Sequence, residues 1–368
     1  MAGVKAADRC PGVLRPHSAE DGAVVRLRLP GGQTTAEVVS ALSSLAETYG
    51  NPDLQLTSRA GIQLRGLPDP LPPGVARTLL GLGLLPSLPH ERVRNIVASP
   101  LTGVTGGRAD LRGLIHDLDH AIIAEPALAA LPGRFLFVLD DGRDDVTDRP
   151  FDLGYRATDG RTGHVLVGGA ALGFPVPIER AVDTLIELAV GFLQAQHTSG
   201  VWHVRELPDW ITGIANLGPV PQPHPGAGCG TVGDLGAAAG VAVPLGLLTP
   251  AQAAALARVA PGPLVITPWR GVVVPGGAAG LAILAEAGLG TDPGSPWSVI
   301  TACVGGPWCA RSAGSTRAAA YDLAAAGRPP TRVHISGCER RCGAPSGDHR
   351  DILVRPEPAV SRSSGAGS

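Results

Sequence analysis

Lysine, cysteine and long apolar runs are scarce in this chain of 368 residues. Lys5 is the only lysine, and the other basic side chains are arginines. No run of about 20 apolar residues occurs, so no membrane-spanning helix is expected. The opening MAGVKAADRCPG lacks the apolar core of a signal peptide. A formal net charge of −2 provides no basic field for nucleic acid or an anionic membrane. We therefore expect a cytoplasmic protein without nucleic-acid or membrane partners.

Six cysteines are too few in so long a chain for a disulfide scaffold. Cys303 and Cys309 form a C-x5-C pair, and Cys338 and Cys342 form a C-x3-C pair. Thiolates are the ligands that iron–sulfur clusters and zinc prefer. Zinc sites usually use C-x2-4-C knuckles, which these pairs only partly resemble. The pattern favours a [4Fe–4S] cluster, with zinc, free thiols or disulfides as alternatives. Cys10 and Cys229 stand alone, and we expect no role for them.

An α/β pattern occurs twice. Residues 24–50 lead from a strand into a helix, where Thr34 and Glu37 have the spacing of a capping box. Residues 241–274 repeat the pattern, with Thr249 as the expected N-cap and Pro250 as the first helical residue. Each copy then places an arginine shortly after a threonine, in Thr57–Arg59 and Thr267–Arg270.

The repeat continues beyond these units. Residues 93–104 match residues 298–310, and residues 134–143 match residues 332–342. The first copy of this half has no cysteines. A duplicated unit leaves a groove between its halves, a common place for a large ligand. Chance similarity between two α/β segments is the alternative.

The cysteine spacing, the T-x-R strand edge followed by IQL, and the VRNI segment match the nitrite/sulfite reductase superfamily in order. The chain resembles this superfamily from about residue 20 to residue 355. Within it, the opening CPGVLRPHSAEDGAVVRLRLPGG is most similar to the precorrin-3B synthases, which are monooxygenases of aerobic cobalamin biosynthesis.

The resemblance implies an α+β fold with a duplicated architecture: two ferredoxin-like half-domains and two larger α/β halves related by pseudo-twofold symmetry. The half-domains are expected at 21–85 and 230–290. The larger halves are expected at 88–220, without a cluster, and at 295–356, with the cluster. Residues 1–20 would form an N-terminal segment and residues 357–368 a disordered tail.

The resemblance also implies cofactors. Cys303, Cys309, Cys338 and Cys342 would hold a [4Fe–4S] cluster, and in the sirohaem enzymes the last of these positions also bridges to the haem iron. In the synthases the tetrapyrrole would be the metal-free substrate precorrin-3A. A mononuclear non-haem iron that handles O2 is also expected, but its ligands cannot be placed.

Arginines are the expected receptors for the many carboxylates of such a tetrapyrrole, because the guanidinium fork binds carboxylates bidentately and keeps its charge. The resemblance places Arg59 and Arg94 at positions that contact macrocycle carboxylates in the sirohaem enzymes. Arg134 falls on the first of two basic positions of that family, and Leu136 occupies the second. Arg270 is a further candidate for substrate binding. For each arginine, a surface charge or a local salt bridge is the alternative.

Other charged side chains give weaker signals. Arg65 is a second-rank candidate, and Arg311, Arg340 and Arg341 lie beside the cysteines, where they could tune the cluster or be solvated. His116 and His120 are spaced i, i+4, which suits a metal, but the polar face of an amphipathic helix is the preferred interpretation. His334 is expected to be a strand residue.

Residues 168–174 have a glycine pair but lack the full dinucleotide-binding pattern. Electrons would therefore come from an external donor, either a ferredoxin or an NAD(P)H-dependent reductase. The leading hypothesis is O2-dependent hydroxylation of precorrin-3A with lactone formation. A sirohaem-dependent sulfite or nitrite reductase is the alternative, although Leu136 weighs against it. A non-catalytic zinc or iron–sulfur protein is the alternative of another class.

Overall fold

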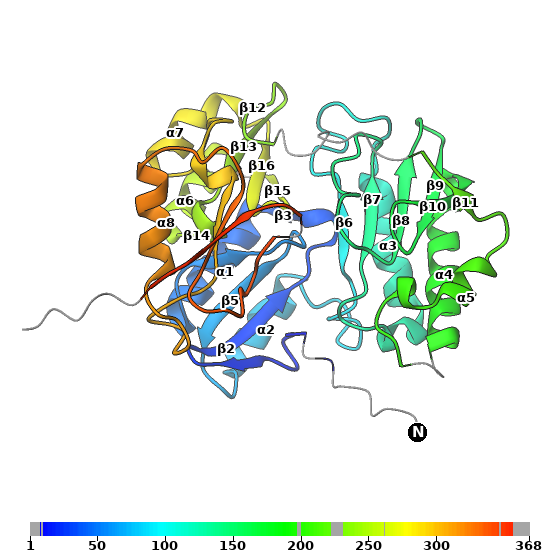
Figure 1. Ribbon diagram of the computed structural model, residues 1–368, viewed down its shortest axis with the longest axis horizontal. Helices are drawn as coiled ribbons and strands as arrows, with labels where there is room; N and C mark the ends of the chain where they lie inside the picture. The colour runs from blue at the N-terminus through cyan, green and yellow to red at the C-terminus, as the bar shows by residue number, and fades with distance from the viewer. Residues whose placement is uncertain are drawn as a thin grey trace, which may run out of the picture. The chain divides into compact units, whose positions relative to one another are not determined.

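The described strands form four sheets, with helices packed against them (Figure 1). The computed structural model describes residue 8 and residues 10–196, 200–221, 231–260, 262–345 and 347–355. Two compact units are present, residues 1–298 and 299–368. The expected tail at 357–368 and Cys229 lie outside the described residues. Among the described helices, none is both long and apolar enough to cross a membrane.

Two five-stranded sheets of the first unit exchange strands between the repeats. The first sheet has the order β1-β2-β5-β4-β14: His17–Ala19, Gly22–Leu27, Ile62–Leu67, Leu54–Leu56 and Leu247–Leu248. The second has the order β12-β13-β16-β15-β3: Gly233–Asp234, Ala238–Ala242, Gly271–Pro275, Pro263–Ile266 and Gln33–Thr35. Strand β14 pairs antiparallel with β4, and β3 pairs antiparallel with β15. Each half-domain therefore completes the sheet of the other.

The helices on these sheets share one apolar core. They are α1 (Ala36–Tyr49), α2 (Pro73–Gly81), α6 (Pro250–Val259) and α7 (Leu281–Glu286). Leu42 of α1 and Leu256 of α6 are buried in the same cluster. The predicted N-cap at Thr249 is confirmed, since its hydroxyl accepts a bond from the backbone N–H of Gln252, and the Gln252 side chain completes a capping box. The predicted cap at Thr34 is wrong by one residue: Thr34 belongs to β3, and Thr35 caps α1.

A six-stranded sheet follows in the same unit, with the order β11-β10-β9-β8-β7-β6. The bounds are Gly218–Pro219, Leu172–Pro177, Thr162–Val167, Leu153–Ala157, Phe137–Asp140 and Ile96–Ala98. Strands β6, β7 and β8 are parallel, whereas β8, β9, β10 and β11 are antiparallel. Helices α3 (Arg112–Ala124) and α4 (Ala181–Gln196) bury Leu118 and Phe192 in one core with Phe137 of β7. The short helix α5 (Pro208–Thr212) follows α4.

The second unit repeats the parallel part of that sheet. Its strands β17 (Ile300–Ala302), β18 (Val333–Ser336) and β19 (Arg350–Leu353) are parallel, and α8 (Thr316–Ala325) connects the first two. The pairing of Ile300 with Val333 corresponds to the pairing of Ile96 with Phe137. The duplicated α+β architecture is confirmed by this match.

Candidate functional site

The two cysteine pairs lie on loops at the same edge of the second unit's sheet. Cys303 directly follows β17, and Cys338 lies two residues beyond β18. The backbone N–H of Gly337 donates to Cys303 Sγ at 3.2 Å, and the N–H of Ala313 donates to the carbonyl of Gly337 at 2.8 Å. No side chain fits at Gly337, because a Cβ there would collide with Ser312. The fold therefore brings the two loops together.

The chemistry of these residues suits a thiolate-bound cluster. Cys303, Cys309, Cys338 and Cys342 are free thiols, partly or fully exposed. Peptide N–H groups that point at sulfur stabilise iron–sulfur clusters. Across the described residues, no three or more His, Cys, Asp or Glu side chains group closely enough to hold a metal ion. The four sulfurs thus do not converge, and the assignment of a cluster to them stays a prediction.

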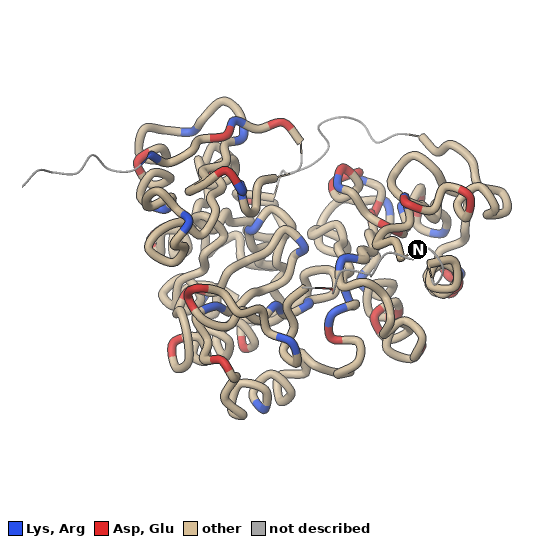
Figure 2. The backbone as a smooth tube through the Cα atoms, turned by 60° about the horizontal axis from the view of Figure 1, so that its bottom comes forward, with Lys and Arg blue, Asp and Glu red and all other residues tan. Residues whose placement is uncertain are grey.

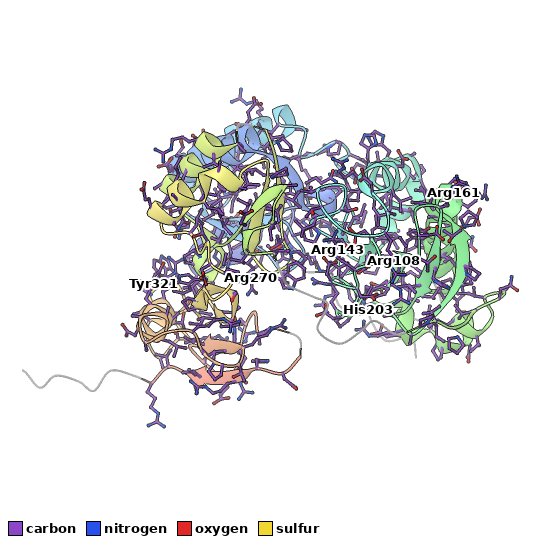
Figure 3. All side chains as sticks on the ribbon, turned by 90° about the horizontal axis from the view of Figure 1, so that it is seen from above. Arg108, Arg143, Arg161, His203, Arg270 and Tyr321 are labelled. Carbon is purple, nitrogen blue, oxygen red and sulfur yellow. The ribbon has the colours of Figure 1, made fainter. Side chains whose placement is uncertain are left out.

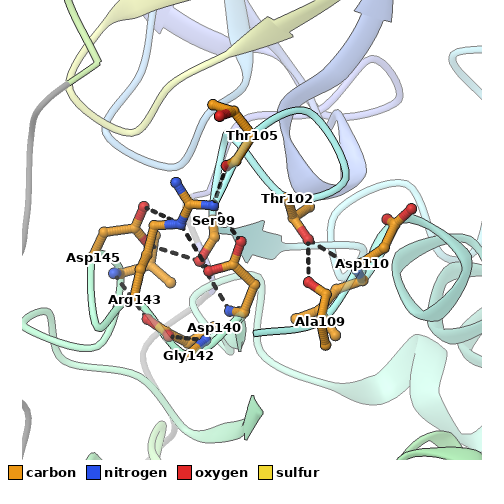
Figure 4. Close-up of polar contacts among 12 residues, drawn as sticks. Ser99, Thr102, Thr105, Ala109, Asp110, Asp140, Gly142, Arg143 and Asp145 are labelled. Atoms are coloured by element: carbon orange, nitrogen blue, oxygen red, sulfur yellow. Dashed lines mark hydrogen bonds and ion pairs between the residues drawn. The ribbon is translucent and has the colours of Figure 1, made fainter. Parts of the chain in front are cut away.

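In the first copy, a serine and a carboxylate cluster occupy the corresponding place. Ser99 follows β6 as Cys303 follows β17. The N–H of Asp141 donates to Ser99 Oγ at 3.1 Å, which matches the contact of Gly337 with Cys303. Ser99 also donates to Asp145 at 2.7 Å (Figure 4). We call Asp140, Asp141 and Asp145 the carboxylate cluster.

Burial and mutual repulsion dominate the electrostatics of this carboxylate cluster. Burial, together with the negative charge of Asp140, raises the pKa of Asp145 to about 7. Burial also raises the pKa of Asp140, although three backbone N–H groups donate to its carboxylate. Arg143 forms a two-bond ion pair with Asp141 (Figure 4). Hydrogen-bonded carboxylates thus join the loops of the first copy.

Four arginines of the first unit line one small pocket, which we call the arginine pocket. Arg26 comes from β2, Arg28 from just beyond its end, Arg59 from the turn before β5 and Arg94 from the segment before β6. The pocket has a volume of about 10 Å³, room for about one water-sized group. A carboxylate oxygen fits this space, so a larger ligand would lie outside it.

Two nitrogen atoms in the arginine pocket have no hydrogen-bond partner among the described residues. They are Arg26 Nε and Arg28 Nη2, and both atoms are buried. Only 5 % of Arg28 is exposed, and burial lowers its pKa to about 10. Burial also lowers the pKa of Arg26 and of Arg59. Buried cations with unused donors are costly, and an anionic ligand would relieve that cost.

The four predicted arginines differ in their surroundings. Arg94 donates two bonds of 2.7 Å to Asp119, so its fork is already engaged in a local salt bridge. Arg59 donates to the carbonyls of Gly133 and Arg134, at 3.4 and 2.7 Å. Arg134 is exposed, and its guanidinium lies 5.5 Å from the centre of the Trp202 ring. Arg59 and Arg94 both line the arginine pocket, whereas Arg134 does not. The role of all three in substrate binding stays a prediction.

Arg270 does not occupy the place of Arg59 in the second copy. The N–H of Gly61 bonds to Thr57 Oγ1, as the N–H of Gly271 bonds to Thr267 Oγ1. The spacing of these turns makes Ala60 the counterpart of Arg270, and both have a left-handed backbone with φ of 56° and 61°. Trp269 is therefore the counterpart of Arg59. The apparent repeat of Thr–Arg in the sequence is out of register by one residue.

Arg26 and Arg28 line the arginine pocket, although no sequence motif points to them. They alternate in the strand segment VRLRL, and residues two apart in a strand lie on the same face. Two buried arginines on one face of an extended segment are unusual, because charged residues are rarely buried. Arginines at alternate positions of this apolar segment are therefore the feature of the sequence that indicates the pocket.

The remaining candidates have local explanations. Arg65 forms a two-bond ion pair with Asp21. The His116 and His120 rings lie 4.0 Å apart on the exposed part of α3. His334 is a strand residue, as predicted, and its Nδ1 is hydrogen-bonded to Thr301 Oγ1 at 2.9 Å. Leu136 is 4 % exposed and packs in an apolar cluster.

Comparisons with known proteins agree with this architecture. The family model of the nitrite/sulfite reductase ferredoxin-like half domain matches residues 16–80. Ferredoxin–nitrite reductase of Zea mays is 28% identical over 87% of this chain and 67% of its own length. Precorrin-3B synthase of a Sinorhizobium species is 29% identical over 36% of this chain and 28% of its own length.

A solved structure, the NirA protein of Mycobacterium tuberculosis, superposes with a TM-score of 0.65 at 20% identity, covering 87% of this chain and 69% of that one. The chain is thus similar to nitrite and sulfite reductases in its first half-domain, in its fold and over much of its sequence, and these relatives are oxidoreductases. The relatives include both nitrite reductases and a precorrin-3B synthase.

Proposed function

We propose that this chain is an oxidoreductase that hydroxylates precorrin-3A with O2 and closes a lactone, as the precorrin-3B synthases do. The observation that carries the proposal is the arginine pocket, where buried donors of Arg26 and Arg28 lack partners. A tetrapyrrole rich in acetate and propionate groups supplies the missing acceptors. The relative from Sinorhizobium supports the choice of substrate.

In this proposal the chain's own residues bind and orient the substrate. Arg28 and Arg26 donate to one carboxylate between them, and Arg59 is held in position by its bonds to the carbonyls of Gly133 and Arg134. Thr57 fixes the turn that carries Arg59 by accepting bonds from two backbone N–H groups. A cluster bound by Cys303, Cys309, Cys338 and Cys342 would supply single electrons from an external donor. One atom of O2 enters the product and the other leaves as water, so the reaction consumes two electrons and two protons.

A sirohaem-dependent nitrite or sulfite reductase is the second candidate, because the maize nitrite reductase matches most of the chain. Leu136 favours the synthase. It stands where the reductases have a second basic residue, and here it is buried among apolar side chains. A buried leucine cannot donate a proton to a substrate anion.

Spectroscopy of the anaerobically purified chain tests the proposal. We expect iron and acid-labile sulfide, no sirohaem bands, and O2 consumption only when precorrin-3A and a reductant are added. Sirohaem bands with nitrite or sulfite turnover would establish the second candidate. A colourless protein that binds one zinc ion would exclude both.

A further inference from the structure

A second basic cavity lies at the end of the six-stranded sheet, and we call it the rim cavity. Arg156 of β8 and His164 of β9 are paired directly across the strands, so both side chains lie on the same face. Arg108 and Asp144 line the same cavity, which has a volume of about 190 Å³. We propose that the rim cavity binds a small oxyanion, either a carboxylate or a phosphate.

The charges of the rim cavity are unbalanced. Arg108 and Arg156 contribute two positive charges, and Asp144 contributes one negative charge. The Arg156 side chain is only 7% exposed, yet its single contact with Asp144 is long, at 3.4 Å. By comparison, Arg94 makes two bonds of 2.7 Å with Asp119. Arg156 is therefore a buried cation whose neutralisation is incomplete, and an oxyanion is its natural partner.

The guanidinium groups are held in place by carbonyl groups. Arg156 donates from its other terminal nitrogen to the carbonyl of Pro221, and Arg108 donates to the carbonyl of Thr158 at 3.3 Å. The stem of Arg108 lies against Gly142, which has φ of 91° and where a Cβ would collide with that stem. These contacts orient both guanidinium groups before any ligand arrives, which lowers the entropy cost of binding.

His164 adds a polar atom that lacks a partner. Its Nδ1 is buried and makes no hydrogen bond with any residue in the described part of the chain. Burial and the charge of Arg156 lower the pKa of His164. A bound anion would offset the charge of Arg156, so it would raise the pKa of His164.

The volume of the rim cavity and its polar lining restrict the ligand to a small group. The rim cavity shares no lining residue with the arginine pocket. Failure of the proposed reaction would therefore leave this binding site untouched, and the reverse also holds.

Titration calorimetry of the full chain tests the proposal with inorganic phosphate, sulfate and acetate at fixed ionic strength. We expect saturable binding of one ion per chain. The Arg156→Gln variant should bind at least about tenfold more weakly, since it loses a charge-assisted contact. Tighter binding of acetate would identify a carboxylate ligand, and tighter binding of phosphate or sulfate a tetrahedral one. The nuclear magnetic resonance titration of His164 should show a higher pKa when the ion is bound.

Arg161→Gln is the matched control, because Arg161 is exposed and lies apart from Arg108 in Figure 3. It should bind the ion as the unmodified chain does. Arg108→Gln, at the exposed mouth of the cavity, keeps the test valid if Arg156→Gln fails to fold, and it too should weaken binding. No saturable binding below about 50 mM, or equal loss in Arg161→Gln, would overturn the proposal.

Discussion

Arg28 shows how a single side chain can report a ligand. Arg28 is only 5 % exposed, and a guanidinium in so buried a residue normally has its donors satisfied by carboxylates or carbonyls, because an unpaired buried donor costs about 1–3 kcal/mol. Arg28 donates to the carbonyls of Pro11 and Arg26, and its Nη2 has no partner. The unpaired Nη2 of Arg28 therefore destabilises the ligand-free protein, and an anionic ligand that accepts its hydrogen bond would remove this free-energy cost.

Replacing Arg28 should therefore separate binding from stability. We expect Arg28→Gln to bind a carboxylate-rich porphyrin at least about tenfold more weakly, a loss of about 1.4 kcal/mol. The thermal midpoint should stay equal or rise, because an uncompensated buried charge is removed. Fluorescence quenching of the porphyrin and calorimetry measure the two effects.

Arg65→Gln is the control for Arg28. Arg65 lies outside the arginine pocket and forms a two-bond ion pair with Asp21. Its replacement should therefore lower the stability of the fold and leave the affinity for the porphyrin unchanged. If both variants weaken binding equally, the arginine pocket is not the binding site.

Asp145 makes stability depend on pH. Its folded pKa is raised to about 7 from an ordinary value of 3.8, so the folded chain holds this proton more tightly than the unfolded chain. Stability from this group is full below pH 4 and is lost as pH rises toward 7, by at most about 4 kcal/mol. Asp145→Asn should remove this loss. Urea unfolding at pH 5 and pH 8 should show a smaller difference in the variant.

Asp148→Asn is the comparison for Asp145, since the Asp148 side chain is 61% exposed. It should keep the pH dependence of the unmodified chain. An unchanged pH dependence in Asp145→Asn would show that the carboxylate cluster is not the cause.

At the scale of residues, the sequence allowed the cysteines to be found but not the full arginine pocket. The spacing of cysteines is a local pattern that can be recognised in the sequence without knowledge of the fold. In the pocket, Arg26 and Arg28, in and just beyond β2, meet Arg59 and Arg94 from later segments, and the pairing of β2 with β5 is what brings the first three together. Arg94 was predicted to contact substrate carboxylates, with a local salt bridge as the alternative, and Asp119 pairs with it from a helix that follows in sequence.

At the scale of elements, the two copies of the repeat hold corresponding loops in place with different side chains. The loop after β6 is held by Ser99 and carboxylates, whereas the loop after β17 is held by a contact to Cys303. The strand registers were not predictable from the apolar pattern. Arg59 and Arg270 lie in the turns before β5 and β16, and a shift of one residue places Trp269 at the position that corresponds to Arg59.

The equivalence of Ser99 and Cys303 leads to a test. Because a serine oxygen accepts the same N–H contact in the first copy, Cys303→Ser should keep the fold of the second unit. The variant should lose bound iron, because a serine hydroxyl is a poor ligand compared with a thiolate. Iron and sulfide analysis, with far-ultraviolet circular dichroism, measures both outcomes.

Cys10→Ser is the control, since Cys10 lies in the first unit and in neither cysteine pair. It should retain the iron content of the unmodified chain. Retention of all iron in Cys303→Ser would show that Cys303 is not a ligand.

At the scale of the whole molecule, the balance of charge differs along the chain. Basic and acidic residues are both distributed over the chain in Figure 2, in keeping with the net charge of −2. Residues 299–355 nevertheless contain eight arginines and four acidic residues, so this segment carries an excess of four positive charges. Such an excess attracts an acidic electron donor and speeds its approach at low salt.

The rate of electron delivery should therefore fall with ionic strength. With an acidic ferredoxin as donor, we expect reduction of the chain to slow about tenfold between low and high salt, because screening shortens the reach of exposed charges. Arg340 is exposed beside Cys338, so Arg340→Gln should slow reduction and flatten the salt dependence. Arg328→Gln removes the same charge from an exposed position ten residues before Cys338 in the sequence and should have the smaller effect. Stopped-flow reduction measures these rates. Equal rates for the two variants would mean that the donor is drawn by the general charge of this unit and does not dock beside the cysteines.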